Sequence, residues 1–191
     1  LLAENPAMDG GEMAKNIVNT YIVEDQRVLD DAARASAFGR SSAEQIIKEL
    51  GSEITLSAVA LENLPDLLVA LDNLIAAMST LDQEQVAEAR TYAQSYESIF
   101  SQDEPSPYID LGHFAQLLAE ISGDSQVVAA ADDLMAAIQQ ALLAEKHGDG
   151  RPGSTGFSIF FPVSSLYAAD SLGAEDYVYI ADSFAQATTW D

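Results

Sequence analysis

Leucines recur at helical intervals between Asn63 and Met78, and this run limits the fold more than any other feature of the chain. Apolar residues three and four positions apart share one face of a helix. Pro65 falls in the first turn, where a proline costs a helix least. The broad apolar face comprises Leu64, Leu67, Leu68, Leu71, Leu74, Ile75 and Met78. Because 48% of the residues are hydrophobic, the chain can bury such a face in a core, and global disorder is unexpected.

The first third of the chain predicts two helices. One spans Gly10 to Val23, and Asp9 caps it with Glu12 as the capping-box partner. Its apolar stripe consists of Met13, Ile17 and Tyr21. The other spans Ala43 to Leu50, and Gly51 would stop it. Between them, Ser36 to Ser42 (SAFGRSS) has the composition of an exposed, mobile or cleavable loop.

Three more helices follow the leucine run. Asp82 would cap one with apolar residues at Val86, Ala89, Ala93, Tyr96 and Phe100, and the short link predicts an antiparallel hairpin with the leucine helix. Asp110 would open the next, which Gly123 ends. Asp124 would cap the third, with apolar residues at Val127, Ala131, Leu134 and Ile138.

Two segments predict strands, and the fold class is therefore mixed α/β. Glu53 to Val59 alternates and is rich in branched residues, while Phe157 to Val163 is apolar enough to be buried on both faces. Ala141 to His147 fits either a helix end or a strand, Gly148 to Gly156 is a turn, and Glu175 to Ala187 is a last short helix. We divide the chain into a helical segment and linker at 1–52 and a strand–helix region at 53–191.

The charge is strongly acidic, with 31 acidic and 8 basic residues and a net charge of −23. Such a surface repels phosphate backbones and anionic lipids, so we expect no nucleic-acid partner and no membrane partner. No apolar run approaches the roughly 20 residues of a membrane helix. The surface could attract cationic partners, or it could serve only to keep the protein soluble.

Candidate catalytic groups are few. The chain has no cysteine, and Ser154 and Ser158 lie near glycines without the G-x-S-x-G pattern. His113 and His147 are the only histidines, and both fit surface positions better than a catalytic base. Adjacent carboxylates point in different directions on a helix, so we expect no acid–base pair from Asp30 and Asp31, Asp132 and Asp133, or Glu175 and Asp176. We assign no catalytic residue and no cofactor.

One alternating group could hold a hard cation. Glu145, His147 and Asp149 would share one face if they lie on a strand. The alternative is that they form the polar rim of a hairpin. The metal assignment stays open at this stage.

Six segments in order resemble the clostripain-like family of cysteine peptidases, from the region that follows the catalytic cysteine. They are NPAMDGGEMAKNIVNTYI, ITLSAVALENLPDLLVALDNL, ARTYAQSYESIF, YIDLGHFAQLL, HGDGRPGSTGFSIFFP and YIADSFAQATTWD. The stretch from Arg27 to Glu49 departs from the family, because it looks longer than the usual linker.

The resemblance implies a caspase-like fold, in which these residues form later strands and helices with an accessory helical layer. It implies an endopeptidase that favours basic residues and whose His and Cys dyad lies upstream, so no catalytic role passes to this chain. The chain begins at Leu1 rather than methionine, and we expect a fragment or processed product. A secreted or cell-envelope location is favoured by the same resemblance.

Besides a metal-binding domain that uses Glu145, His147 and Asp149, two functional hypotheses result. The chain is either a non-catalytic portion of such a peptidase, with the upstream catalytic segment as its partner and cationic peptides as possible substrates, or a stand-alone acidic module that binds a cationic partner. The first predicts an exposed edge around ITLSAV or FSIFFP, and the second predicts a self-contained core without one.

Overall fold

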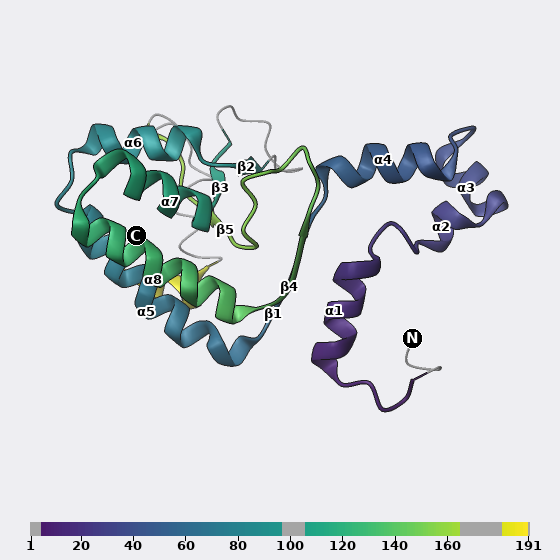
Figure 1. Ribbon diagram of the computed structural model, residues 1–191, viewed down its shortest axis with the longest axis horizontal. Coiled ribbons are helices and arrows are strands. Elements are labelled where there is room, and N and C mark those ends of the chain that lie inside the picture. Colours follow the sequence, from purple (N-terminus) through teal and green to yellow (C-terminus); the bar gives the residue numbers. More distant parts are fainter. Residues whose placement is uncertain (1–4, 97–105, 165–180, 191) are drawn as a thin grey trace. The chain divides into compact units, whose positions relative to one another are not determined.

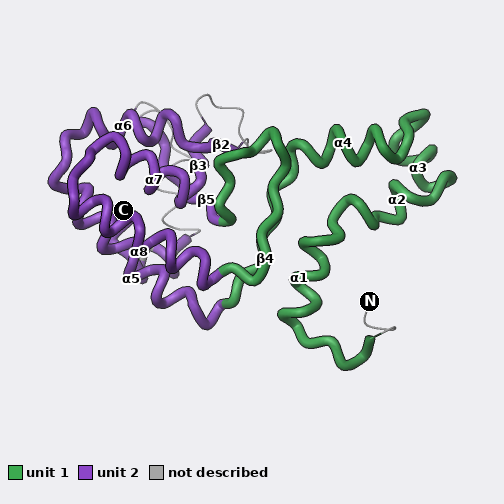
Figure 2. The backbone as a smooth tube through the Cα atoms, in the orientation of Figure 1, with its two compact units in different colours: residues 1–60, 142–156 green, residues 61–141, 157–191 purple. Residues whose placement is uncertain are grey.

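The chain is a mixed α/β protein, mostly helical with two small antiparallel sheets, which confirms the predicted class (Figure 1). The computed structural model describes residues 5–96, 106–164 and 181–190. Two compact units divide the chain (Figure 2). Unit 1 comprises residues 1–60 and 142–156, and unit 2 comprises residues 61–141 and 157–191. The units are interleaved in sequence.

Unit 1 contains four helices: α1 (Gly10–Thr20), α2 (Gln26–Leu29), α3 (Asp31–Phe38) and α4 (Ala43–Glu53). The predicted capping box of α1 is confirmed, because an Asp9 carboxylate oxygen accepts from the Glu12 amide at 2.7 Å and Glu12 accepts from the Asp9 amide. Gly51 does not stop α4, which continues to Glu53, because this glycine has ordinary helical geometry. The predicted loop at 36–42 shrinks to Gly39–Ser42, since α3 extends to Phe38.

The predicted apolar stripe of α1 is wrong. Ile17 and Tyr21 are 44% and 43% exposed, whereas Val18 and Ile22 are buried. Helix α1 ends at Thr20, before the predicted end at Val23, and Ile22 has a positive φ of 65°, so Ile22 is buried by the turn that follows the helix. Ile22 belongs to a small core with Val28 and Ile46, which joins the end of α1 to α2 and α4; Phe38, Ala43 and Ile47 pack around it.

The sheet of unit 1 has two strands. Strand β1 (Thr55–Val59) pairs antiparallel with β4 (Leu142–His147), so that Thr55 faces His147, and the register shifts between Ala58 and Val59. The open question about residues 141–147 is therefore resolved, because the strand begins at Leu142 directly after a helix ends at Ala141. Helix α1 packs against this sheet.

Unit 2 is built around helices that follow the predicted leucine and alanine patterns. After a short 3-10 turn η1 (Leu61–Asn63) come α5 (Leu64–Met78), α6 (Gln83–Tyr92), α7 (Leu111–Ser122), α8 (Ser125–Ala141) and α11 (Asp182–Ala187). Gly123 ends α7 in the left-handed conformation, and Asp124 accepts from two amides at the start of α8, as predicted. No described helix is long and apolar enough to span a membrane.

The predicted hairpin of the leucine helix and the following helix is wrong. Helix α5 packs against α8, and α6 packs against α7, with α7 and α8 in contact between them (Figure 1). Helix α6 also ends at Tyr92, whereas the pattern predicted continuation past Tyr96, which lies in a strand. The predicted apolar position Phe100 and the start of the last predicted helix, residues 175–180, lie outside the described residues.

The second sheet has the order β2–β3–β5, formed by Ser95–Tyr96, Tyr108–Asp110 and Ser158–Phe160. The prediction of a strand buried on both faces is wrong for Phe157 to Val163. The strand covers only three residues, of which Ile159 is buried and Ser158 is exposed. ITLSAV and FSIFFP thus contribute to separate sheets.

Trp190 connects the last described residues to the core of unit 2. Its indole N–H donates to the Phe160 carbonyl at 3.0 Å, and its ring packs edge-on against Phe161 and Phe114. Phe114 is fully buried. The aromatic cluster therefore joins α7 to the segment that follows β5.

Candidate functional site

The turn that follows β4 packs directly on the last turn of α4. The Gly148 amide donates to the Ile54 carbonyl at 3.0 Å, and the Gly150 amide donates to the Ser52 carbonyl at 2.8 Å. Both glycines are needed for this approach, because an added Cβ on Gly148 or Gly150 would lie within 2.3 Å of an oxygen atom. The Arg151 Nε forms an ion pair with the Glu53 carboxylate at 3.1 Å. The motif GDGRPGSTG is therefore a packing element of unit 1.

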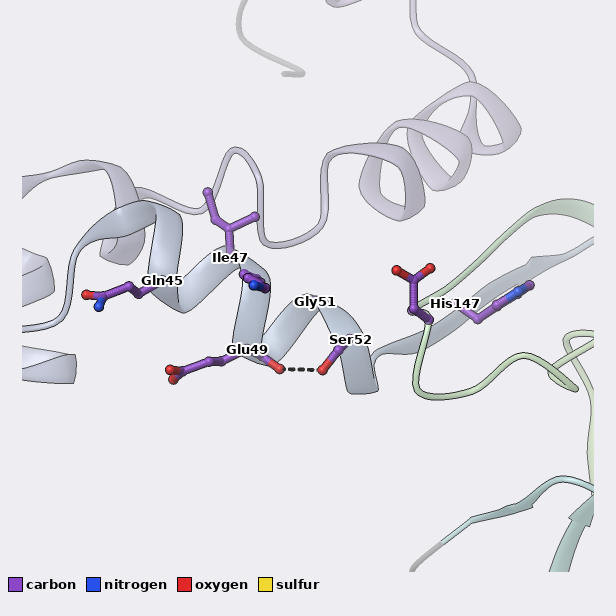
Figure 3. A pocket seen from close by; sticks show the side chains of 9 residues that line it. Gln45, Ile47, Glu49, Gly51, Ser52 and His147 are labelled. Atoms are coloured by element: carbon purple, nitrogen blue, oxygen red, sulfur yellow. Dashed lines mark hydrogen bonds between the residues drawn. The ribbon is translucent and has the colours of Figure 1, made fainter.

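A pocket of about 740 Å³ lies where α4 and this turn meet (Figure 3). Figure 3 shows Gln45 and Glu49 extending from one side of α4 and Ile47 from the other, with His147 beyond the end of the helix. The residues that line it are Gln45, Ile47, Lys48, Glu49, Gly51, Ser52, His147, Gly148 and Asp149. This pocket contains two of the three residues of the candidate cation group.

Glu145 and His147 lie on the same face of β4, as the alternation predicted. The His147 Nδ1 lies 2.9 Å from a Glu145 carboxylate oxygen. A carboxylate at Nδ1 fixes the orientation of an imidazole, and this arrangement can accept or donate a proton at Nε2. No serine or threonine hydroxyl is hydrogen-bonded to His147 in the described part of the chain.

Asp149 does not join that pair, because it lies beyond the end of the strand in the turn. Within residues 5–96, 106–164 and 181–190, no three acidic or histidine side chains gather closely enough to hold a metal ion. The cation hypothesis for Glu145, His147 and Asp149 gains no support. The hairpin alternative is wrong as well, because β4 pairs with β1 rather than with the strand that follows it.

His113 has a structural role. Its Nδ1 accepts a hydrogen bond from the Gln94 backbone amide at 2.9 Å. Its own amide donates to Asp110, whose other carboxylate oxygen accepts from the Tyr96 hydroxyl at 2.8 Å. Asp110 is fully buried. These contacts join β2, β3 and the start of α7, and they leave the Nδ1 of His113 unavailable as a base.

The remaining candidates are separated. Ser154 is buried in unit 1, whereas Ser158 is exposed on β5. Asp30 accepts from the Ala33 amide as the cap of α3, and Asp31 pairs with Arg34. Asp132 and Asp133 are both exposed on α8, and Glu175 and Asp176 lie outside the described residues.

Sequence reasoning missed Arg90, which is only 4% exposed. Its Nε donates to the Phe161 carbonyl at 2.8 Å and its Nη2 donates to the Ser106 carbonyl. Burial lowers the pKa of this guanidinium from its usual value. The signal was available, because Arg90 is the only basic residue between Glu53 and Lys146 and follows the apolar positions Val86 and Ala89.

Comparisons with protein families, with curated proteins and with solved structures found no match for this chain.

Proposed function

We propose that this chain is the non-catalytic C-terminal portion of a clostripain-like cysteine endopeptidase, which supports an upstream catalytic half that cleaves after basic residues. The observation that carries the proposal is the two-stranded sheet of unit 1. Neither outer edge of β1 or β4 has a strand neighbour among the described residues. A lone two-stranded sheet is marginal in water, and an open edge can pair with another strand.

The geometry of β1 identifies the groups available for such pairing. The Gly148 amide donates to the Ile54 carbonyl, so these two residues face each other as a hydrogen-bonded pair. Hydrogen-bonded and non-hydrogen-bonded pairs alternate along an antiparallel ladder. The backbone groups of Leu56 therefore point toward β4, and those of Thr55 and Ser57 point away from it. On this proposal a strand of the catalytic half adds at that outer edge, and β1 becomes part of a caspase-like sheet.

Two proline variants, made in the full-length natural protein, test whether a strand of the catalytic half pairs with the outer edge of β1. Thr55→Pro removes only an outward N–H, and the preceding Ile54 already has the extended backbone (φ −68°, ψ 145°) that a following proline requires. Leu56→Pro removes an N–H of the β1–β4 ladder. We expect Thr55→Pro to retain the fold of unit 1 and to lose arginyl-peptide cleavage, whereas Leu56→Pro loses both. Full activity in Thr55→Pro would contradict the edge pairing.

The proposal that the chain belongs to a longer peptidase is tested by the intact mass of the natural protein and by its sequence before Leu1. We expect a histidine and a cysteine upstream, and cleavage of an arginyl peptide that thiol alkylation abolishes. An upstream region without this pair would contradict the peptidase assignment.

The distribution of charge favours a second candidate, an acidic interaction module. Unit 2 carries 19 acidic residues and a single basic one, and that one is the buried Arg90. Its described surface therefore presents no arginine or lysine. Such a field attracts cations over roughly one Debye length, about 10 Å at 0.1 M salt.

A titration with oligolysine distinguishes the two candidates. An interaction module binds oligolysine in the absence of any catalytic half, and binding weakens as salt rises. The double variant Asp132→Asn/Asp133→Asn removes two exposed charges from α8 and should weaken binding further. In the peptidase, the same field would only speed the approach of basic substrates. If the double variant left the salt dependence of substrate capture unchanged, that steering role would be ruled out.

A further inference from the structure

We propose that a cavity of unit 2, lined by α5, the start of α7, β5 and α11, binds an uncharged aliphatic molecule, an alkyl chain that ends in a hydroxyl or a similar neutral head group. The cavity has a volume of about 350 Å³. Pockets that bind small ligands in proteins have volumes of about 300–1,000 Å³. Every residue that lines the cavity belongs to unit 2, so the inference does not depend on the peptidase assignment.

The floor of the cavity is buried and aliphatic. Its residues are at most 7% exposed and are Leu67 and Leu71 of α5, Leu111 of α7 and Ile159 of β5. The Leu111 amide donates to the Phe157 carbonyl at 2.9 Å, which fixes the start of α7 against β5 at this floor. An alkyl chain placed here exchanges contact with water for contact with aliphatic carbon, so the floor favours a hydrocarbon.

The opening of the cavity carries its polar groups, and both are serine hydroxyls. Ser158 of β5 and Ser183 of α11 line the cavity and are exposed. A serine hydroxyl donates one hydrogen bond and accepts two, so it suits a hydroxyl, an ester or an amide. A bound molecule would therefore place its chain on the floor and its head group at the two serines.

The cavity offers no partner to a charged head group. None of the described residues that line it has an ionisable side chain. Burying a charge without an opposite charge is costly. A carboxylate meets a second obstacle, because unit 2 carries 19 acidic residues and its single basic residue, Arg90, is buried. The lining therefore selects against fatty acids and against cationic amphiphiles.

Helix α11 supplies one wall through Phe184, and two contacts directly after the helix hold it in place. The Thr189 amide and hydroxyl donate to an Asp72 carboxylate oxygen at 2.7 and 2.9 Å, which ties the chain to α5. The Trp190 indole donates to the Phe160 carbonyl of β5 at 3.0 Å. These contacts fix α11 relative to α5 and β5, so the cavity is formed before a ligand binds.

Equilibrium dialysis of the full chain against primary alcohols, from butanol to decanol, tests the site. We expect binding that saturates at one molecule per chain. Each added methylene should tighten binding about fourfold, which is the hydrophobic contribution of one buried CH₂ group. A gain below about twofold per methylene, or binding that does not saturate at one molecule, would overturn the site.

The head group is then varied while the length of the chain is kept. Decanoate and decyltrimethylammonium should each bind more weakly than decanol, by a factor on the order of tenfold. If decyltrimethylammonium bound as tightly as decanol, the acidic field of unit 2 rather than the lining would attract the ligand, and the neutral class would be overturned. Equal binding of decanoate would overturn it as well.

Two tryptophan variants separate the cavity from the rest of the surface. Leu68 of α5 lines the cavity and is half-buried, whereas the next residue, Val69, is 61% exposed and does not line it. Leu68→Trp fills the space and should weaken decanol binding by a factor on the order of tenfold or more. Val69→Trp is the matched control and should bind decanol as the wild type does.

A second filled variant approaches the cavity from α11. Ala187 lines the cavity and is exposed, so Ala187→Trp narrows the opening without changing the packing of α5. It should weaken decanol binding to a similar extent, and circular dichroism shows whether each variant keeps the wild-type helical content. Wild-type decanol binding in a folded Leu68→Trp or Ala187→Trp chain would overturn the proposal.

Discussion

A Cβ placed on Gly148 would lie 2.0 Å from the carbonyl oxygen of Gly51. The turn after β4 and the last turn of α4 are thus in direct backbone contact, although 96 residues separate them in the sequence. Gly51 itself is unconstrained, because a Cβ there would meet nothing within 4 Å. One glycine of the pair is required by packing and the other is not.

Gly148→Ala should destabilise unit 1 by about 1–3 kcal/mol, because the methyl group forces two backbones apart. Gly51→Ala is the matched control and should stabilise by about 1 kcal/mol, since alanine is the better helix residue. Urea unfolding followed by circular dichroism measures both. Equal midpoints for the two variants would show that this close contact does not form.

Arg90→Met should destabilise unit 2 by about 2–4 kcal/mol, because the Phe161 and Ser106 carbonyls lose their donor. Arg90→Lys should recover only part of this, since an ammonium lacks the planar fork that reaches both oxygens. Trp190 is the only tryptophan and packs against Phe161, so its fluorescence reports the transition. A wild-type melting temperature in Arg90→Met would contradict the role of the guanidinium.

His113→Leu should cost about 1–3 kcal/mol, because the half-buried Gln94 amide loses its acceptor. In His113→Asn the side-chain oxygen takes the place of Nδ1 and should retain most of the stability. Thermal unfolding of the two variants gives the comparison. If both lose the same amount, the contribution of His113 is ring packing rather than this hydrogen bond.

Asp25 should make unit 1 sensitive to acid. Hydrogen bonds from Arg27 hold the pKa of this carboxyl below its usual value of 3.8. A lowered pKa adds stability that is complete above the unfolded value and is lost as the pH falls through the folded one. Asp25→Asn should therefore be less stable than wild type at neutral pH, and the difference should shrink below about pH 4.

Asp82 provides the control for that experiment. It occupies the same cap position at the start of α6, but its side chain makes no capping hydrogen bond. Asp82→Asn removes no capping hydrogen bond, so it should keep the wild-type stability at neutral pH. An Asp25→Asn deficit that persists undiminished in acid would contradict the electrostatic origin.

Local patterns predicted the helices of unit 2 well. The leucine spacing located α5, Gly123 and Asp124 marked the boundary between α7 and α8, and Asp110 was correctly expected to open α7. Each of these signals lies within one or two helical turns, where spacing and capping chemistry act directly.

Pairing between distant segments could not be predicted in the same way. The partner of β1 is β4, more than 80 residues away, and the partner of α5 is α8 rather than the next helix. The burial of Ile22 was missed because the helical spacing was extended past Thr20, where α1 ends and the chain turns. In the candidate site, the shared face of Glu145 and His147 followed from strand alternation, whereas the contact of Gly148 with α4 depends on tertiary packing.

The distribution of charge between the two units has a practical consequence for chemical labelling. All three lysines, Lys15, Lys48 and Lys146, belong to unit 1, so unit 2 contains no side-chain amine. Amine-directed reagents such as N-hydroxysuccinimide esters will therefore mark unit 1 and leave the side chains of unit 2 unmodified. Carboxyl-directed coupling will mark both units, because unit 1 carries 12 of the 31 acidic residues, so the amine reagent is the one that distinguishes the two units without any substitution.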